Sequence, residues 1–260
     1  FLFLINTGMV ARCEGAVSSF DQLAQAVQSA QSGDIVYLED TIVVSGSQSL
    51  TAPGIIITGK AGFDKASMLK ISPESSLCLT GITLRGNGTV QTEGTTGLIE
   101  VETHASLILN GCHIENAAGN AIYGLFGKRV ELLNSSISGG KSNAVNLNGN
   151  CLLTVDNGKL FRNTGTAIYL SNSCTLSLKE CDIYENGAGI FCSGSTASVA
   201  NSRIYNNYSD GILTDTTYTV SALSIENCNI YGNCGMAVRT NFNVDSTCTI
   251  SGSRLNNNGS

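Results

Sequence analysis

The sequence predicts an all-β solenoid of parallel strands, and three observations support this fold class. An apolar anchor residue recurs at spacings of 23, 23, 23, 21, 26 and 25 residues. Apolar residues also alternate with period two before each anchor, which is typical of strands with one buried face. The third observation is composition, because 29 glycines and 25 asparagines beside 2 prolines indicate many tight turns of one recurring type. The anchors are Ile114, Ile137, Leu160, Ile183, Ile204, Ile230 and Leu255.

Each period has room for about three short strands, and a single unit of this size cannot bury its own apolar face. Stacked units can, and stacking would place equivalent residues about 4.8 Å apart, the usual distance between paired strands. A helix does not explain the pattern, because the apolar spacing is two rather than three or four. We therefore expect columns of like residues inside the stack, with residues 33–260 forming one solenoid domain.

The N-terminal part contains two further segments. Residues 1–15 begin with an apolar stretch that fits either the remnant of a secretory signal or a first strand. Residues 16–32 are predicted to form an amphipathic capping helix, with Ser18 or Ser19 at its start. Its apolar residues at helical spacing are Phe20, Leu23, Val27 and Ala30. Such a helix would cover the open end of the stack, where exposed strand edges would otherwise invite aggregation.

Bulk properties exclude several classes of function. The formal net charge is −6, so clustered cations that would neutralise nucleic-acid phosphates are not expected. Hydrophobic residues make up 42% and charged residues 13% of the 260 residues, which argues against a disordered chain. Beyond the N-terminal segment, no stretch is long and apolar enough to predict a membrane span.

The repeated frame N-x-x-I-x-x-N, followed by Gly or Ala before Ile, resembles the repeats of pectate-lyase-like proteins. The segment 16–44 resembles the N-terminal helix and first strand of that family. The resemblance implies a right-handed parallel β-helix with an N-terminal capping helix, but it implies little about function because this scaffold carries many activities. The sequence stops inside a coil, so we expect further coils or another domain after residue 260.

The asparagines and cysteines receive structural interpretations. Two asparagine rows keep a constant phase, and we expect both to lie at turns, with left-handed backbone and amides bonded to stacked neighbours. Cysteines two positions before an anchor are expected to point inward as small hydrophobic residues. Cys151 and Cys174 would stack on adjacent coils, as free thiols or as a disulfide. The first asparagine row is Asn163, Asn186, Asn207, Asn233 and Asn258, and the second is Asn134, Asn157, Asn201 and Asn227.

The aromatic row one position after the anchors favours packing, or a platform for sugar rings if it faces outward. It consists of Phe161, Tyr184, Tyr205 and Tyr231.

Charged residues on the outer wall are the candidate catalytic group. Lys159, Asp182 and Arg203 alternate in sign on successive coils, and Arg162 and Glu185 lie nearby. A surface salt ladder would explain them without any function. Alternatively, they could hold an acidic polysaccharide. In polysaccharide lyases of the similar family, a Lys or Arg removes a proton beside a uronate carboxylate that calcium neutralises.

The family's catalytic motifs are absent, since neither R-x-P-x-x-R nor W-x-D-H nor D-P-H occurs. Irregular spacing marks loops instead, and loops of such folds commonly carry binding residues. Candidate ligand contacts at one corner are Asp215, Tyr218, Phe242 and Asp245. No metal-binding motif is present, so calcium enters only through the lyase hypothesis.

Three functions stay open from the sequence. The first is a secreted or cell-surface module that binds polysaccharide or a host glycan along its outer wall. The second is an enzyme acting on acidic polysaccharide, specifically a lyase. The third is a surface adhesin or structural rod without catalysis.

Overall fold

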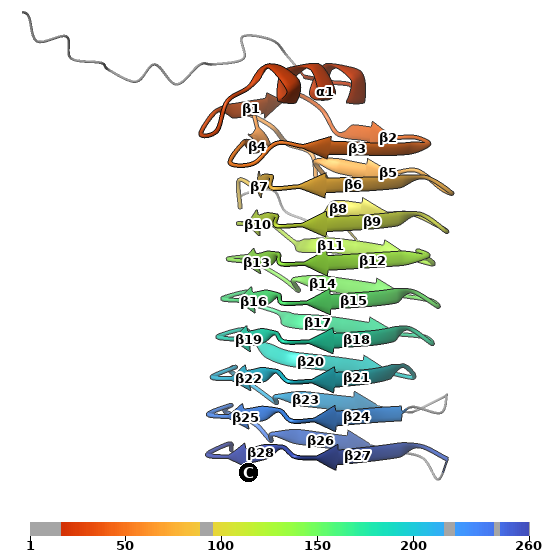
Figure 1. Ribbon diagram of the computed structural model, residues 1–260, viewed down its shortest axis with the longest axis vertical. Helices are drawn as coiled ribbons and strands as arrows, with labels where there is room; N and C mark the ends of the chain where they lie inside the picture. The colour runs from red at the N-terminus through yellow and green to blue at the C-terminus, as the bar shows by residue number, and fades with distance from the viewer. Residues whose placement is uncertain (1–16, 89–95, 216–221, 242–244, 260) are drawn as a thin grey trace, which may run out of the picture.

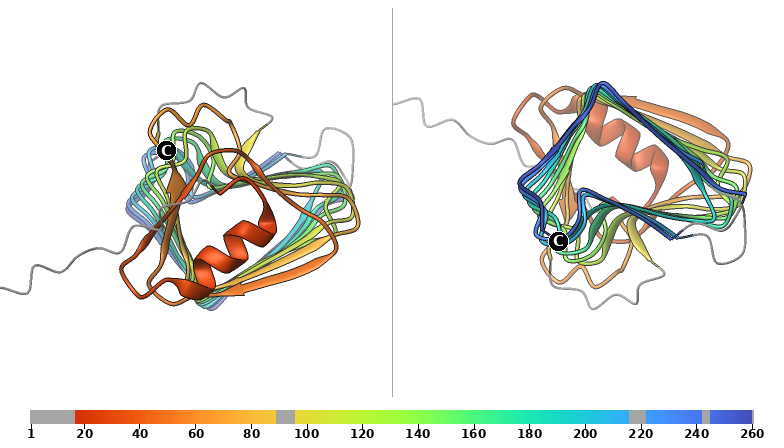
Figure 2. Two further views of the ribbon diagram at one scale, coloured as in Figure 1. Left: turned by 90° about the horizontal axis from the view of Figure 1, so that it is seen from above. Right: turned by 90° about the horizontal axis from the view of Figure 1, so that it is seen from below.

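The computed structural model is a stack of coils in which three parallel sheets run along the whole length (Figure 1). It describes residues 17–88, 96–215, 222–241 and 245–259. The segment predicted as a signal remnant or first strand, residues 1–15, therefore lies outside the described residues. Each coil contributes one strand to each sheet, and seen along the stack the coils superpose as a rounded triangle (Figure 2). The predicted parallel β-helix solenoid with an N-terminal helix is confirmed.

Helix α1 (Phe20–Ser29) lies across the N-terminal end of the stack and packs on β1, β2 and β3 (Figure 2). Ser19 is its N-cap, because the Ser19 hydroxyl accepts a hydrogen bond from the Gln22 amide at 3.3 Å. The helix ends at Ser29, before an extended residue, so it is shorter than the predicted segment 16–32. Its buried side chains are Leu23, Ala26 and Val27, and they close the apolar end of the stack.

Sheet A contains the shortest strands, most of them three residues long and centred on the predicted anchors. Its strands are β1 (Ile35–Leu38), β4 (Ile56–Gly59), β7 (Thr83–Arg85), β10 (His113–Glu115), β13 (Ser136–Ser138), β16 (Lys159–Phe161), β19 (Asp182–Tyr184), β22 (Arg203–Tyr205), β25 (Asn229–Tyr231) and β28 (Arg254–Asn256).

Sheets B and C form the other two walls. Sheet B consists of β2 (Ile42–Val44), β5 (Leu69–Ile71), β8 (Gly97–Val101), β11 (Asn120–Leu125), β14 (Val145–Asn148), β17 (Thr166–Ser171), β20 (Ala188–Ser193), β23 (Ile212–Asp215) and β26 (Val238–Asn241). Sheet C consists of β3 (Ser47–Thr51), β6 (Ser76–Thr80), β9 (Ser106–Asn110), β12 (Arg129–Leu133), β15 (Leu152–Asp156), β18 (Thr175–Lys179), β21 (Thr196–Ala200), β24 (Ala222–Glu226) and β27 (Thr247–Ser251).

The strand register confirms the predicted columns. In sheet A, Leu160 pairs with Ile183 and Ile183 pairs with Ile204, and all three side chains are fully buried. The residues on either side of each anchor point outward, as period-two alternation requires. Burial of one continuous apolar column across the coils is the main stabilising contribution, since no single coil has a core of its own.

The two asparagine rows turn out to differ, which corrects the single expectation given to both. Asn186 belongs to the first row and is fully buried with an ordinary backbone, whereas Asn157 in the second row has a φ of 51°. In the first row the left-handed residue is instead the one before the asparagine, for example Glu185 with a φ of 55°. The first row is thus an internal hydrogen-bond ladder, and the second is a set of left-handed turns.

The internal ladder provides hydrogen-bond partners for the buried backbone groups at the corner between sheets A and B. The Asn186 side-chain amide donates to the Leu160 carbonyl at 2.9 Å and to Asn207 Oδ1 at 3.1 Å. The same pattern repeats in the neighbouring coils, so buried backbone groups at this corner find partners without water.

Candidate functional site

The predicted charged residues come together on the outer face of sheet A. We call the outward residues of β16, β19, β22, β25 and β28, with the corner residue after each strand, the ladder wall. Register pairs Lys159 with Asp182 and Asp182 with Arg203 on successive strands. Arg162 and Glu185 occupy the corner positions next to them, both with left-handed backbone. These five residues therefore lie on one surface, as the repeat spacing predicted.

Most of these charged side chains form ion pairs with one another. Arg203 forms a bidentate pair with Asp182, with Nε to Oδ1 at 2.7 Å and Nη2 to Oδ2 at 2.8 Å. Arg162 Nε donates to Glu185 Oε2 at 2.7 Å. Lys159 is exposed and forms no salt bridge with any residue that the structure describes. Lys159 is thus the cation in this group that is not already held by a carboxylate.

The ion pairs also decide which side chains could accept a proton. The hydrogen bond to Asp182 raises the pKa of the Arg203 guanidinium, and the hydrogen bond to Glu185 does the same for Arg162. A general base needs its pKa moved down toward the working pH, so these two shifts run the wrong way for a base. Both arginines are better suited to holding an anion than to removing a proton.

The predicted aromatic row is a continuous stack on the ladder wall. Ring centroids are 5.0 Å apart from Phe161 to Tyr184, 5.0 Å from Tyr184 to Tyr205 and 5.1 Å from Tyr205 to Tyr231, with interplanar angles of 5°, 8° and 3°. Because the rings lie face to face with one another, ring edges and not faces point to the solvent. A sugar ring would meet phenol edges and hydroxyls here, which does not suit face-on stacking.

The predicted loop contacts are only partly described. Asp215 ends β23 and pairs in register with Asn241 at the end of β26, while Asp245 is exposed just before β27. Tyr218 and Phe242 lie outside the described residues. The two aspartates do lie at the corner between sheets B and C, as the spacing indicated.

Two charged groups were missed because they show no repeating phase. On the outer face of sheet C, Arg129 Nε donates to Glu131 Oε1 at 2.6 Å, and the Glu131 side chain is only 11% exposed. On sheet B, Lys70 Nζ lies 2.9 Å from Glu102 Oε1 and 3.9 Å from Glu100 Oε2. The i, i+2 spacing of an Arg and a Glu on a predicted strand could have revealed the first pair, because such residues share a face.

The cysteines confirm the predicted inward column. Cys112, Cys181 and Cys228 are buried, and each thiol contacts a backbone carbonyl of the preceding coil. Burial raises the pKa of the Cys181 thiol to about 11. Cys151 and Cys174 are both buried and are free thiols, so of the two predicted alternatives the structure has the unlinked pair.

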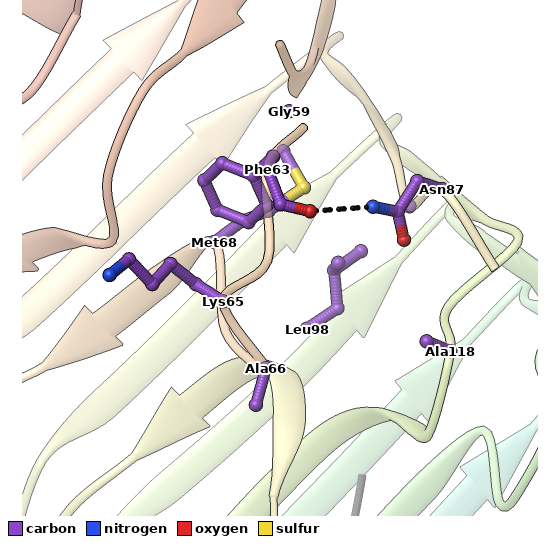
Figure 3. Close-up of a pocket in the computed structure, with 9 residues that line it drawn as sticks. Gly59, Phe63, Lys65, Ala66, Met68, Asn87, Leu98 and Ala118 are labelled. Carbon is purple, nitrogen blue, oxygen red and sulfur yellow. Dashed lines mark hydrogen bonds between the residues drawn. The ribbon is translucent and has the colours of Figure 1, made fainter. Parts of the chain in front are cut away.

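Two hollows differ in what they could hold. A shallow groove of about 330 Å³ crosses β18, β21, β24 and β27 on sheet C, lined by Ser and Thr hydroxyls and by Ala and Leu side chains, with no charged residue among them. A second hollow beside Phe63 and Asn87 has about 10 Å³, room for one water at most (Figure 3). Asn87 Nδ2 donates to the Phe63 carbonyl at 3.0 Å there, so this hollow is a packing feature (Figure 3).

The described part of the chain has neither a cluster of metal-ligating side chains nor a helix that could span a membrane. No group of three or more His, Cys, Asp or Glu side chains there is placed to hold a metal ion. None of the described helices has the length and apolar character needed to cross a bilayer.

Comparisons with known proteins concern the fold. A family model described as a right-handed β-helix region matches residues 54–222, more than half of the chain. A mutant of the periplasmic alginate epimerase AlgG is similar, with 12% identity, a TM-score of 0.60, and coverage of 87% of this chain and 66% of that one. The mannuronan C-5 epimerase AlgE4 A-module of Azotobacter vinelandii shows 16% identity, a TM-score of 0.51, and coverage of 87% and 71%. The chain thus spans about two thirds of these proteins, and at such identities the likeness shows the fold alone. No curated protein sequence matches.

Proposed function

Because the chain belongs to the right-handed β-helix family, we propose that it is a secreted or cell-surface module that binds an acidic polysaccharide along the ladder wall. The charge of this wall is the observation that carries the proposal. The wall carries four cations and two anions, although the net charge of the chain is −6. The cations are Lys159, Arg162, Arg203 and Arg254, and the anions are Asp182 and Glu185. A locally cationic surface on an acidic protein attracts an anionic polymer.

The geometry suits a polymer that lies parallel to the stack axis. Equivalent side chains repeat about every 4.8 Å along the wall, so successive coils could contact successive sugars. Asp182 holds Arg203 in a fixed orientation through two of its five N–H groups, which leaves three for a ligand carboxylate or hydroxyl. Lys159 adds an exposed charge one coil from Asp182 and two coils from Arg203. The similar structures named for alginate and mannuronan epimerases support a polysaccharide as the ligand class, and the periplasmic one supports a location outside the cytoplasm.

In this proposal the loops at the corner between sheets B and C form a second contact region for the ligand. Asp215 and Asp245 accept hydrogen bonds from sugar hydroxyls in this proposal, and Tyr218 and Phe242 supply aromatic contacts. Asp215 and Asn241 lie in register on adjacent strands, which provides two polar side chains at neighbouring coils.

Binding of polymannuronate oligosaccharides, measured by isothermal titration calorimetry, tests the proposal. Lys159→Ala should weaken binding about fivefold, equivalent to about 1 kcal/mol for one exposed ionic contact. Asp182→Asn should strengthen binding, because it releases Arg203 and removes a negative charge from the wall. Lys128→Ala removes an exposed cation at the corner before β12 and should leave the affinity unchanged. Added salt should weaken binding through screening.

A lyase is the second candidate function, and the unpaired Lys159 is the observation that favours it. In this hypothesis Lys159 takes the proton beside a uronate carboxylate, and Arg203, Arg162, Asp182 and Glu185 position the sugar. Calcium is not assigned a role, because the described carboxylates do not form a metal site. Incubation with uronate polymers should then produce unsaturated ends that absorb ultraviolet light, and Lys159→Ala should abolish them.

The two assays separate the three functions. Binding without new absorbance supports the binding module, and absorbance that depends on Lys159 supports the lyase. If neither binding nor new absorbance is observed, both proposals are contradicted. That result favours the structural rod, whose function is to be a stiff, extended stack.

A further inference from the structure

We propose that Tyr184, Tyr205 and Tyr231 form an oxidative cross-linking site, in which adjacent phenols couple to dityrosine and join successive coils covalently. The modifying partner is a haem peroxidase with hydrogen peroxide. This inference is independent of what the ladder wall binds, since it rests on the tyrosine stack alone.

The geometry of the stack carries the proposal. Tyr184 pairs in register with Tyr205, and Tyr205 pairs with Tyr231, on the neighbouring strands β19, β22 and β25. The rings are nearly parallel at centroid distances of 5.0 and 5.1 Å. In such a stack, equivalent carbons of neighbouring rings lie about as far apart as the centroids do. The carbon beside each hydroxyl therefore faces its counterpart in the next coil.

The solvent exposure and the protonation state of these tyrosines are also compatible with oxidative coupling. The three side chains are half-buried, so their ring edges reach solvent. Within the described part of the chain, no group hydrogen-bonds to the hydroxyl of Tyr184 or Tyr205, which leaves both hydroxyls open to an external oxidant. Burial raises the pKa of both phenols, so the rings are uncharged at neutral pH and stack without repulsion.

The chemistry balances with one peroxide for each link. Each phenol gives up one electron and its hydroxyl proton, which leaves two phenoxyl radicals. The radicals join through one carbon–carbon bond between the carbons beside the oxygens, and the hydrogens on these carbons return to the oxygens to restore the phenols. Hydrogen peroxide takes the two electrons and two protons and leaves as two waters.

The rest of the chain provides a matched control. Tyr169 stacks on Phe191 at 4.7 Å on sheet B, and Phe161 stacks on Tyr184, but neither pair contains two phenols. Stacking alone is thus present at all these positions, whereas coupling is restricted to the three tyrosines. Phenylalanine already occupies this column at position 161, so Tyr205→Phe should preserve the stack and the fold.

Peroxidase treatment at low protein concentration, followed by trypsin and mass spectrometry, tests the site. Cleavage after Lys179, Arg203 and Arg239 places Tyr184 on peptide 180–203 and both Tyr205 and Tyr231 on peptide 204–239. We expect these two peptides to appear joined with the loss of two hydrogen atoms, and fragmentation to place the link on Tyr184 and Tyr205. Peptide 204–239 should also appear alone with the same loss, from the link between Tyr205 and Tyr231.

Two variants decide the interpretation. Tyr205→Phe should abolish both products, because Tyr184 and Tyr231 are then two coils apart, while Tyr169→Phe should leave both yields unchanged. A joined product that persists in Tyr205→Phe would overturn the proposal. So would wild-type protein that forms only intermolecular links, for which the 72% exposed Tyr208 is the natural site.

Discussion

The inside and the outside of the same coil follow different rules. In the coil that contains β19, Ile183 and Asn186 point inward and are fully buried, whereas Asp182 and Glu185 point outward. An inward side chain contacts its equivalents above and below, and no water can replace a contact that is lost. An outward ion pair is exchanged readily for water, so it contributes little to stability. The interior columns therefore fix the fold, and the exterior columns are where a ligand can bind.

The largest expected effect comes from the internal ladder. Asn186→Ala should lower the free energy of unfolding by about 3 kcal/mol or more, because it breaks several buried hydrogen bonds at once. The Asn163 backbone N–H loses its acceptor, and the Asn163 side-chain amide and the Leu160 carbonyl each lose one partner. Urea unfolding followed by circular dichroism measures the change. A loss below about 1 kcal/mol, as for an exterior residue, would contradict the distinction between inside and outside.

An intermediate effect is expected for the cysteine column, and it depends on pH. Burial raises the pKa of Cys181 from 9.0 to about 11, so the folded state favours the neutral thiol. The resulting stabilisation is complete below about pH 9 and is lost as the pH rises toward 11, on the order of 2–3 kcal/mol in total. Cys181→Ser should therefore reduce the fall in unfolding free energy across this pH window.

The control for this prediction lies in the same column. Ser202→Ala changes a buried side chain that does not titrate, so its effect on the unfolding free energy should be the same at pH 8 and pH 10. If Cys181→Ser also had equal effects at the two pH values, burial of the thiol would not contribute to the alkaline loss of stability.

The smallest expected effect belongs to the ladder wall. A double-mutant cycle of Asp182→Ala and Arg203→Ala should give a coupling energy of about 0.2–1 kcal/mol, as is usual for exposed pairs. The bidentate geometry places the expectation toward the upper end. A coupling energy well above 2 kcal/mol would mean that this pair supports the fold, which would weaken its proposed role as a ligand surface.

The sequence predicted the interior better than the corners, for a physical reason. Anchors such as Ile183 and small inward residues such as Cys181 follow period-two alternation, so the pattern shows which way they face. Asn186 lies three residues after the anchor, where simple alternation predicts an outward side chain. The left-handed residue Glu185 turns the chain between them and points Asn186 inward. The constant spacing of the asparagines from the anchors revealed that the row exists. It did not reveal whether the row lies inside or outside the stack.

On the exterior, the repeat fixed which residues are neighbours but not which of them interact. Asp182 has Lys159 on one adjacent strand and Arg203 on the other, and only Arg203 forms the ion pair. This choice depends on side-chain rotamers, which a period of about 23 residues does not specify. The Arg129–Glu131 pair was missed for a related reason, because a site formed by one coil leaves no periodic signal.

The most direct test of the proposed function is to locate the ligand on the molecule. Backbone amide shifts in a ¹⁵N-labelled sample, titrated with a polymannuronate oligosaccharide, would map the contact surface. Binding along the ladder wall predicts the largest shifts at residues 159–162, 182–185 and 203–206, on three successive coils of sheet A. Shifts confined to the uncharged groove on β18, β21, β24 and β27, or no shifts at all, would contradict binding along the ladder wall.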